Sequence, residues 1–446
     1  MADDIDRETS MDMPPLDWRR VLFVALLFLS WEGVVPAVIG LPISLGRYAV
    51  GALVLVGVGL SAMRFIVRPK ISRARLGSSW FFLYCVAVTV IYSGLVHGLP
   101  PREWLFAQYM LLPLLIGYLF VSLRISWRDI VFGMLVAATL CSVISLADQM
   151  LRLPQFDQFA RGSINSRGVR RMFLMRVETG FSIVLLSAWL FLRWKMDRKA
   201  VLALLVLALN VLVLFGISES RQSMLTTSLA LLFFVLFARL RPMRVLKVGL
   251  AGLFVGLPLV IFLARDILER LVTSDDYIVD GNISIRFQAI DFYMSKWTET
   301  YGFGFGVLSN GDDASNFFAQ AWRIGNGYWG YMIADTGIVS ALTQFGWIGL
   351  MLVLLISFRL AVGFIRIGRA LPQDQRFVPI ALGCFLLGSM VNPWPMNYFT
   401  LEWTILFGSA CWFAYGNMLD TMPALRPASA IASKDHREMR PAAAPG

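Results

Sequence analysis

Side chains that bind metals or cross-link a chain are scarce in this sequence. Its 446 residues include only two histidines, and its four cysteines stand singly in apolar stretches, at Cys85, Cys141, Cys384 and Cys411. Single cysteines in such surroundings predict small buried packing residues, with no disulfide and no CxxC-type metal site. His436 lies in the polar C-terminal tail, which leaves His97 as the only histidine near a predicted membrane surface. We therefore expect no metal centre and no cofactor.

Charge is scarce as well. Only 15% of the residues are charged, 57% are hydrophobic, and the mean hydropathy is +0.67. A soluble domain of this length could not cover so much apolar surface, so the expected solvent is lipid. The net charge of +11 then reflects Lys and Arg in short cytoplasmic loops, and no nucleic-acid partner is expected. The acidic N-terminus lacks the basic start and short apolar core of a cleavable signal peptide, so the first helix should remain as an anchor.

Long apolar runs predict an all-α polytopic membrane protein with about twelve transmembrane helices. The runs centre near residues 30, 57, 88, 113, 139, 185, 209, 231, 256, 345, 385 and 410. Each even-numbered connection between them is basic, with examples at Arg64 and Arg68, Arg124 and Arg128, Arg193 and Lys195, Arg239 and Arg241, and Arg359 and Arg366. Because positive loops stay in the cytoplasm, both termini are predicted to be cytoplasmic.

This pattern divides the chain into five segments. A cytoplasmic segment covers 1–18, nine helices cover 19–264 with a basic outer loop at 151–175, a large outer loop covers 265–331, three helices cover 332–420, and an Ala/Pro/Ser-rich tail covers 421–446. The composition of the tail predicts disorder. No repeat of fixed period is present, which disfavours an internally duplicated transporter.

The outer loop at 151–175 departs from the charge rule, because it is strongly basic although it should lie outside the cytoplasm. Its arginines, continued into the next helix, are Arg152, Arg161, Arg167, Arg170, Arg171 and Arg176. One interpretation is a tolerated exception to a statistical rule. The other is that this loop binds anions at the membrane surface, because the planar guanidinium holds phosphate oxygens in a two-pronged manner.

Three further charged residues lie in or beside the large outer loop. Arg221 opens a helix and either extends to the headgroups or lines the bundle. Arg286 lies in an apolar stretch that predicts an amphipathic helix continuing through Trp297, and it is either a surface charge of that helix or part of the site. Asp335, at the outer end of the tenth helix, either caps that helix or acts as a base. The run Gly302–Gly306 is not preceded by a strand, so it indicates a tight turn with close backbone approach rather than a nucleotide site.

These residues together resemble the O-antigen polymerase/ligase superfamily, whose members transfer lipid-linked glycans at the periplasmic face of the bacterial inner membrane. The matching pieces are Ser220-Arg221, Arg286 leading to Gly302–Gly306, and Asp335-Thr336-Gly337 followed by the helical stretch Phe345–Leu350. They come in the family order around the large outer loop, and the match covers roughly residues 215–360. Each motif is short, so the combination carries the specificity.

The resemblance implies roles for individual residues. Arg221 and Arg286 match the family's arginines that hold the donor diphosphate, and the basic loop around Arg161–Arg176 matches loosely the first functional outer loop. Ligases of this superfamily carry a histidine where Asp335 stands, so the aspartate favours the polymerase and exopolysaccharide branch, with Asp335 as the base. The implied ligands are a polyprenyl-diphosphate-linked oligosaccharide and membrane lipid. The implied protein partners are a chain-length regulator and a flippase.

The implied reaction is a metal-independent, inverting glycosyl transfer from a polyprenyl-diphosphate donor, and no ATP motif is present. Two alternatives stay open: a ligase that transfers a finished glycan, and a flippase or transporter for a lipid-linked or anionic substrate. Ionisable residues lie mostly at predicted helix ends, with Asp148 and Glu402 as exceptions. This distribution disfavours a transporter, which should carry charged or broken helices near the bilayer midplane.

Overall fold

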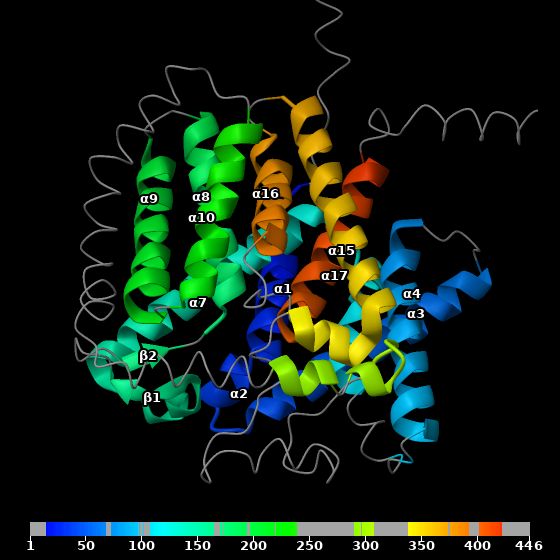
Figure 1. The fold of residues 1–446 in the computed structure, drawn as a ribbon. Helices are drawn as coiled ribbons and strands as arrows, with labels where there is room; N and C mark the ends of the chain where they lie inside the picture. The colour runs from blue at the N-terminus through cyan, green and yellow to red at the C-terminus, as the bar shows by residue number, and fades with distance from the viewer. Residues whose placement is uncertain are drawn as a thin grey trace, which may run out of the picture.

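The fold is a bundle of membrane-length and shorter helices with one small sheet (Figure 1). The structure is a computed structural model that describes residues 15–67, 73–96, 98, 101, 108–164, 170–172, 174–193, 197–218, 220–238, 290–295, 297–306, 338–372, 375–391 and 401–421. Five helices in this part are long and apolar enough to cross a membrane: Ile43–Arg64, Ser79–Val96, Trp127–Leu151, Arg198–Ser218 and Ala341–Ala370. The chain is thus a helical protein with membrane-spanning character.

The elements follow one another along the chain in a helical series. They are α1 (Trp18–Trp31), α2 (Val34–Val38), α3 (Ile43–Val67), α4 (Arg73–Val88), the π-helix η1 (Thr89–Val96), the 3₁₀-helix η2 (Gln108–Leu115), α6 (Ile116–Ser122), α7 (Trp127–Leu151), η3 (Pro154–Phe159), β1 (Ala160–Ile164), β2 (Arg170–Met172), α8 (Arg176–Arg193), α9 (Arg198–Val211), the π-helix η4 (Leu212–Ser218), α10 (Arg221–Phe237), α15 (Ile338–Ala370), α16 (Phe377–Val391) and α17 (Leu401–Thr421). Every predicted apolar centre falls in one of these helices, except the centre near residue 256, which lies outside the described residues.

The basic loop at 151–175 contains regular structure that the sequence did not predict. After η3, strands β1 and β2 form an antiparallel pair in which Ala160 faces Met172 and Ile164 faces Arg170. The sheet, α2 and the short helix formed by residues 290–295 and 297–299 lie at the same end of the bundle, at the bottom of Figure 1. The described residues of the two predicted outer loops therefore lie at the same end of the molecule.

Polar hydrogen bonds connect the start of α1, the start of α7 and the end of α17. Ser126 and Asp129 form a capping box at the start of α7, in which Asp129 Oδ2 accepts from Ser126 N at 2.9 Å. Asp129 also accepts from the backbone N of Asp17 at 3.2 Å, and Asn417 Oδ1 accepts from Trp127 N at 3.0 Å. Such caps satisfy helix N–H groups that have no partner within their own helix.

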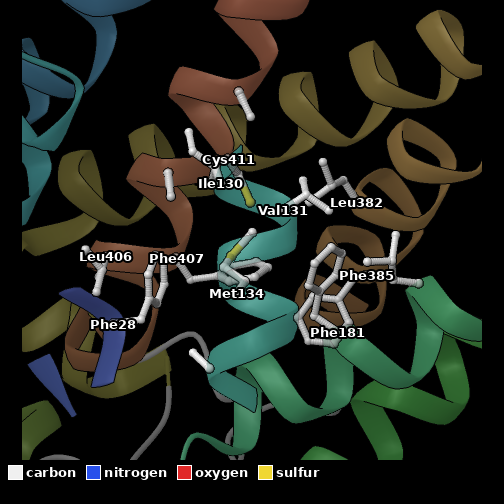
Figure 2. Packing of buried hydrophobic residues seen from close by; sticks show 14 of the residues in the cluster. Phe28, Ile130, Val131, Met134, Phe181, Leu382, Phe385, Leu406, Phe407 and Cys411 are labelled. Atoms are coloured by element: carbon white, nitrogen blue, oxygen red, sulfur yellow. The ribbon is translucent and has the colours of Figure 1, made fainter. Parts of the chain in front are cut away.

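The core between α1, α7, α8, α16 and α17 is apolar and closely packed (Figure 2). Phe181, Phe385 and Phe407 meet edge to face, with ring centroids 5.4–5.7 Å apart. Such aromatic pairs contribute about 0.5–1.5 kcal/mol beyond the area they bury. All four cysteines are buried free thiols, as expected for packing residues.

Reporter fusions will test the orientation of the chain. Fusions after residues 72, 196, 243 and 365 should report a cytoplasmic position, because these points lie within the basic connections. Fusions near residues 162 and 300 should report an extracytoplasmic position. The measurement is paired phosphatase and fluorescent-protein activity at each point. A cytoplasmic signal at 300 would contradict the predicted position of the large outer loop and the site built on it.

Candidate functional site

The predicted site residues are described to different extents. Arg167, Arg286 and Asp335 lie outside the described residues. The backbone of Arg161 lies in β1, that of Arg170 and Arg171 lies in β2, and Arg221 is the first residue of α10; the side chains of these four lie outside the described part. Of the arginines proposed for the site, the structure therefore locates the side chain of Arg176; Arg152, which begins the basic loop, is exposed at the end of α7.

Arg176 is the first residue of α8 and connects the basic loop to the start of α10. Its side chain is half-buried, and Nη1 donates to Ser220 Oγ at 3.4 Å. Ser220 is buried, lies immediately before Arg221, and shares a hydrogen bond of 3.0 Å with Ser223. The basic outer loop and the Ser220-Arg221 motif are 44 residues apart in the chain and meet here.

A cavity with a volume of about 100 Å³ lies behind Arg176, between α8, α10, α15, α16 and α17. Its polar lining comprises Arg176, Ser223, Thr226, Thr227, Ser357, Ser389 and Ser409, and its apolar lining includes Phe81, Leu114, Val353, Ile356, Leu360, Phe385, Leu386, Phe407 and Trp412. A mostly apolar pocket with a few polar groups is the usual form of a small-molecule site.

The polar and apolar parts of this lining come from different sets of helical turns. Arg176 and the hydroxyls of Ser223, Thr226 and Thr227 come from the first turns of α8 and α10. Ser389 comes from the last turn of α16, which runs antiparallel to α10 at this point, since Gly388 lies against the backbone of Thr226 and Ala230. Val353, Ile356 and Leu360, in contrast, come from the part of α15 beyond Gly346. The lining therefore combines Arg176 and hydroxyl groups of several helices with a mostly apolar stretch of α15 that also includes Ser357.

Two hydroxyls of the lining have no hydrogen-bond partner within the described part of the chain. Thr227 Oγ1 and Ser409 Oγ are fully buried atoms, on side chains that are 1% and 5% exposed. A buried hydroxyl without a partner costs about 1–3 kcal/mol. Thr227 Oγ1 lies against Gly180 of α8, because a Cβ atom added at Gly180 would be 2.6 Å from it. No sequence signal marks Ser409, because a single serine in an apolar helix is ordinarily a packing residue.

The glycine run forms the close backbone approach that the sequence predicts. Gly302, Gly304 and Gly306 all have positive φ, between 82° and 89°. A Cβ atom on Gly304 would lie 2.6 Å from the carbonyl oxygen of Gln344 and would also meet Gly346 N. Only glycine fits this conformation in this space.

The run docks where α15 is interrupted at Gly346 (φ 65°, ψ −177°), which the sequence analysis placed inside one helix. In a regular helix, the N–H of residue 347 would bond to the carbonyl of residue 343. Here Trp347 N donates to Gly302 O at 3.1 Å, while the carbonyls of Thr343 and Gln344 accept from Phe305 N at 2.8 Å and Gly306 N at 2.6 Å. The loop therefore satisfies the backbone groups that the interruption releases.

Neighbouring side chains complete this junction. Tyr84 Oη donates to Phe345 O at 2.7 Å, and Ser93 Oγ donates to Phe305 O. Phe305 is 1% exposed, and Thr343 Oγ1 lies 3.5 Å from Tyr293 O of the helix that precedes the glycine run. Burial raises the pKa of the Tyr293 phenol well above its ordinary value, so it stays neutral at physiological pH. The described residues of this segment, 290–295 and 297–306, are thus fixed to the first part of α15.

Substitution of Gly304 by Ala should destabilise the protein by a few kcal/mol. A positive φ costs a non-glycine residue roughly 1–2 kcal/mol, and the displaced neighbours add about 1–3 kcal/mol. Gly40→Ala is the matched control, because Gly40 also has a positive φ of 72° but has nothing within 4 Å of the added Cβ. The thermal midpoint of the purified protein should fall clearly more for Gly304→Ala. Equal shifts would contradict the docked position of the loop.

The described residues contain no group of three or more His, Cys, Asp or Glu side chains that could hold a metal ion. No known family model matches this chain, and no curated protein matches it. The resemblance to the O-antigen polymerase/ligase superfamily therefore stays a prediction from the motifs.

Proposed function

We propose that this chain is a polymerase of lipid-linked oligosaccharide repeat units, acting at the periplasmic face of a bacterial inner membrane. The observation that supports this most is the position of Arg176. This arginine directly follows the basic loop, contacts the Ser220-Arg221 motif, and lines a cavity inside a helical membrane protein. A cation in the lining of a mostly apolar cavity suits a substrate that has an anionic head and a lipid tail.

The proposed reaction is an inverting glycosyl transfer. A hydroxyl oxygen at the non-reducing end of one lipid-linked unit attacks the anomeric carbon of the growing chain. The bond between that carbon and the phosphate oxygen breaks, the polyprenyl diphosphate leaves with the bonding electrons, and the hydroxyl proton passes to Asp335. Because the energy is stored in the donor's glycosyl–diphosphate bond, no ATP is consumed.

In this scheme, the arginines stabilise the negative charge of the leaving group. Negative charge develops on the leaving diphosphate, and Arg221, Arg286 and the basic loop around Arg161–Arg176 stabilise it. Fixed cations in a site shielded from water stabilise such charge more strongly than water does. The products would be a longer polymer, as in O-antigen or exopolysaccharide synthesis, and a free polyprenyl diphosphate.

One observation favours the flippase alternative. Glu178 is 3% exposed within α8, and its Oε2 atom has no hydrogen-bond partner in the part of the chain that the structure describes. Buried carboxyl groups in membrane bundles are typical of ion-coupled carriers. Asp148 is the other carboxyl group that was expected away from a helix end. Its Oδ1 atom accepts a hydrogen bond from Leu153 N at 3.0 Å, which stabilises the end of α7.

Purified protein and purified lipid-linked repeat units provide the direct test. The full-length protein in lipid nanodiscs should convert the units to polymer with release of polyprenyl diphosphate, in the presence of a chelator and without nucleotide. A ligase would attach the glycan only when an additional acceptor is present. A flippase would form no polymer and would instead move the units across sealed vesicles.

Replacement of Arg221 by Lys should lower the polymerisation rate sharply while the amount of protein in the membrane stays normal. Lysine keeps the charge but loses the two-pronged geometry toward phosphate, so the transition state loses part of its stabilisation. A loss of one such contact corresponds to a rate decrease of about tenfold or more. Polymer length and rate in cells and in nanodiscs are the measurements. An Arg221→Lys variant as active as the native protein would mean that Arg221 only anchors the helix at the headgroups.

A further inference from the structure

We propose that Glu178 of α8 binds a proton inside the helical bundle and is therefore neutral in the folded protein. The proton comes from the aqueous phase and converts the carboxylate to a carboxylic acid. Glu178 lies outside the proposed catalytic scheme, so this proton site does not depend on glycosyl transfer. Only its effect on Arg176, two residues earlier, rests on the proposed function.

The burial of Glu178 leaves a charge on its side chain without support. The side chain is 3% exposed, and its Oε2 atom is fully buried and has no hydrogen-bond partner within the described part of the chain. Glu178 also forms no ion pair with a described residue. Neither water nor a partner would therefore stabilise the carboxylate, and a buried carboxyl group in this situation takes up a proton instead.

The polar side chain one turn further along the same face of α8 is already engaged. Ser182 accepts a hydrogen bond from Asn210 Nδ2 of α9 at 2.8 Å, and Asn210 Oδ1 accepts from Ser142 Oγ of α7 at 2.6 Å. All three side chains are buried. The amide of Asn210 and the hydroxyl of Ser142 therefore serve this network rather than a charge on Glu178.

Three titratable groups on other elements interact electrostatically with Glu178. They are the carboxyl group of Glu32 at the end of α1, the thiol of Cys141 on α7 and the thiol of Cys411 on α17. None of these three groups can become a cation. Any charge that they carry is negative and favours the neutral form of Glu178.

The lack of space at Glu178 selects a proton rather than a metal ion. Because Oε2 is fully buried, there is no room beside it for a sphere the size of a water molecule. A metal cation needs several oxygen ligands around it, and the described residues contain no group of three or more His, Cys, Asp or Glu side chains that could supply them. A proton needs neither a cavity nor further ligands.

A neutral Glu178 preserves the positive potential at the candidate site. Arg176 precedes it by two positions, which is about 200° around a helix, so the two side chains leave α8 on different sides. Arg176 donates to Ser220 Oγ and lines the cavity. An ionised carboxylate at Glu178 would lower the potential there, because protein of low dielectric constant screens charge weakly. The proton on Glu178 therefore favours an anionic substrate group at Arg176.

The protonation state of Glu178 can be measured in the native protein. Val177-Glu178 is the only Val-Glu pair of the sequence. Full-length protein that is isotope-labelled on valine carbonyls and on glutamate therefore yields the carboxyl shift of Glu178 selectively, by solid-state NMR in nanodiscs. At neutral pH we expect the shift of a neutral carboxyl group, unchanged by sodium or potassium. The shift of an ionised carboxylate, or a change on addition of either cation, would overturn the proposal.

A second buried carboxyl group provides a matched control. Asp129 is 0% exposed, but its carboxylate accepts hydrogen bonds from Ser126 N, Ser126 Oγ and Asp17 N. Glu178→Gln replaces a neutral acid by a neutral amide of the same shape, so the thermal midpoint of the purified protein should change little. Asp129→Asn should lower it, because the amide nitrogen cannot accept these bonds. Equal losses in the two variants would contradict a neutral Glu178.

The rate of polymer formation at rising pH tests the effect on Arg176. Once NMR shows an ionised Glu178, polymerisation by the native protein should slow more than polymerisation by Glu178→Gln. Equal slowing would remove the effect on Arg176. A native protein with a neutral Glu178 that forms no polymer would leave the proton site standing and remove the polymerase assignment. An ionised Glu178 in an active polymerase would do the reverse.

Discussion

Cells that carry Asp335→Ala are expected to accumulate single lipid-linked repeat units on the outer leaflet and to form no long polymer. In the proposed reaction Asp335 accepts the proton of the attacking hydroxyl, and loss of a general base typically lowers a rate by a factor of about 10²–10⁴. Repeat units are still made and translocated, so they collect at the step before polymerisation. The measurement is the chain-length distribution of the extracted lipid-linked glycans.

Two control variants test whether Asp335 acts as a base. Asp335→Asn keeps the size of the side chain but cannot accept the proton, so it should be as inactive as Asp335→Ala. Asp276→Ala removes another carboxylate of the large outer loop, one that no motif singles out, and should leave polymer length unchanged. An active Asp335→Asn protein would show that Asp335 only caps the helix that follows it.

Replacement of Arg286 by Ala should reduce polymerisation roughly a hundredfold or more, because one diphosphate contact contributes a few kcal/mol to transition-state stabilisation. The expected product is again the single lipid-linked unit on the outer leaflet. Arg270→Ala, which removes a different arginine of the same loop, is the matched control and should retain polymer. Polymer length and the rate in nanodiscs are measured for both variants.

The leaflet on which the units collect separates the enzyme from the flippase. Units of the Arg286→Ala strain that react with an impermeant reagent from outside the membrane have been translocated, as the polymerase proposal requires. Units protected on the inner leaflet would mean that translocation has failed. The flippase alternative would then replace the proposed glycosyl transfer.

The apolar periodicity and the charge pattern were sufficient to predict the helical membrane character, because the bilayer imposes segment length and satisfied backbone groups. A helix was found at each predicted apolar centre that lies within the described residues. The sheet between β1 and β2 was missed, since a short arginine-rich hairpin has neither the length nor the alternation that marks a strand.

The candidate site was likewise predictable from the sequence only in part. The basic loop and the Ser220-Arg221 motif were both recognised as sequence features, but only the structure shows that Arg176 contacts Ser220. The cavity was out of reach of sequence reasoning, because it is formed by single residues of several helices, such as Thr227 and Ser409. The glycine run was predicted as a close approach, whereas its partner at Gly346 has no sequence signal that distinguishes it from an ordinary helix glycine.

The junction between the glycine run and α15 also imposes an order on biogenesis. Without the loop, the bent helix would expose the carbonyls of Thr343 and Gln344 and the N–H of Trp347 to lipid, and each unsatisfied group costs several kcal/mol there. We therefore predict that the segment leaves the insertion machinery as a straight helix. It would acquire its bend once Gly302–Gly306, which the sequence predicts to be exported, has folded back against it. On this prediction, export of the loop is a precondition for the mature shape of a helix that follows it in the chain.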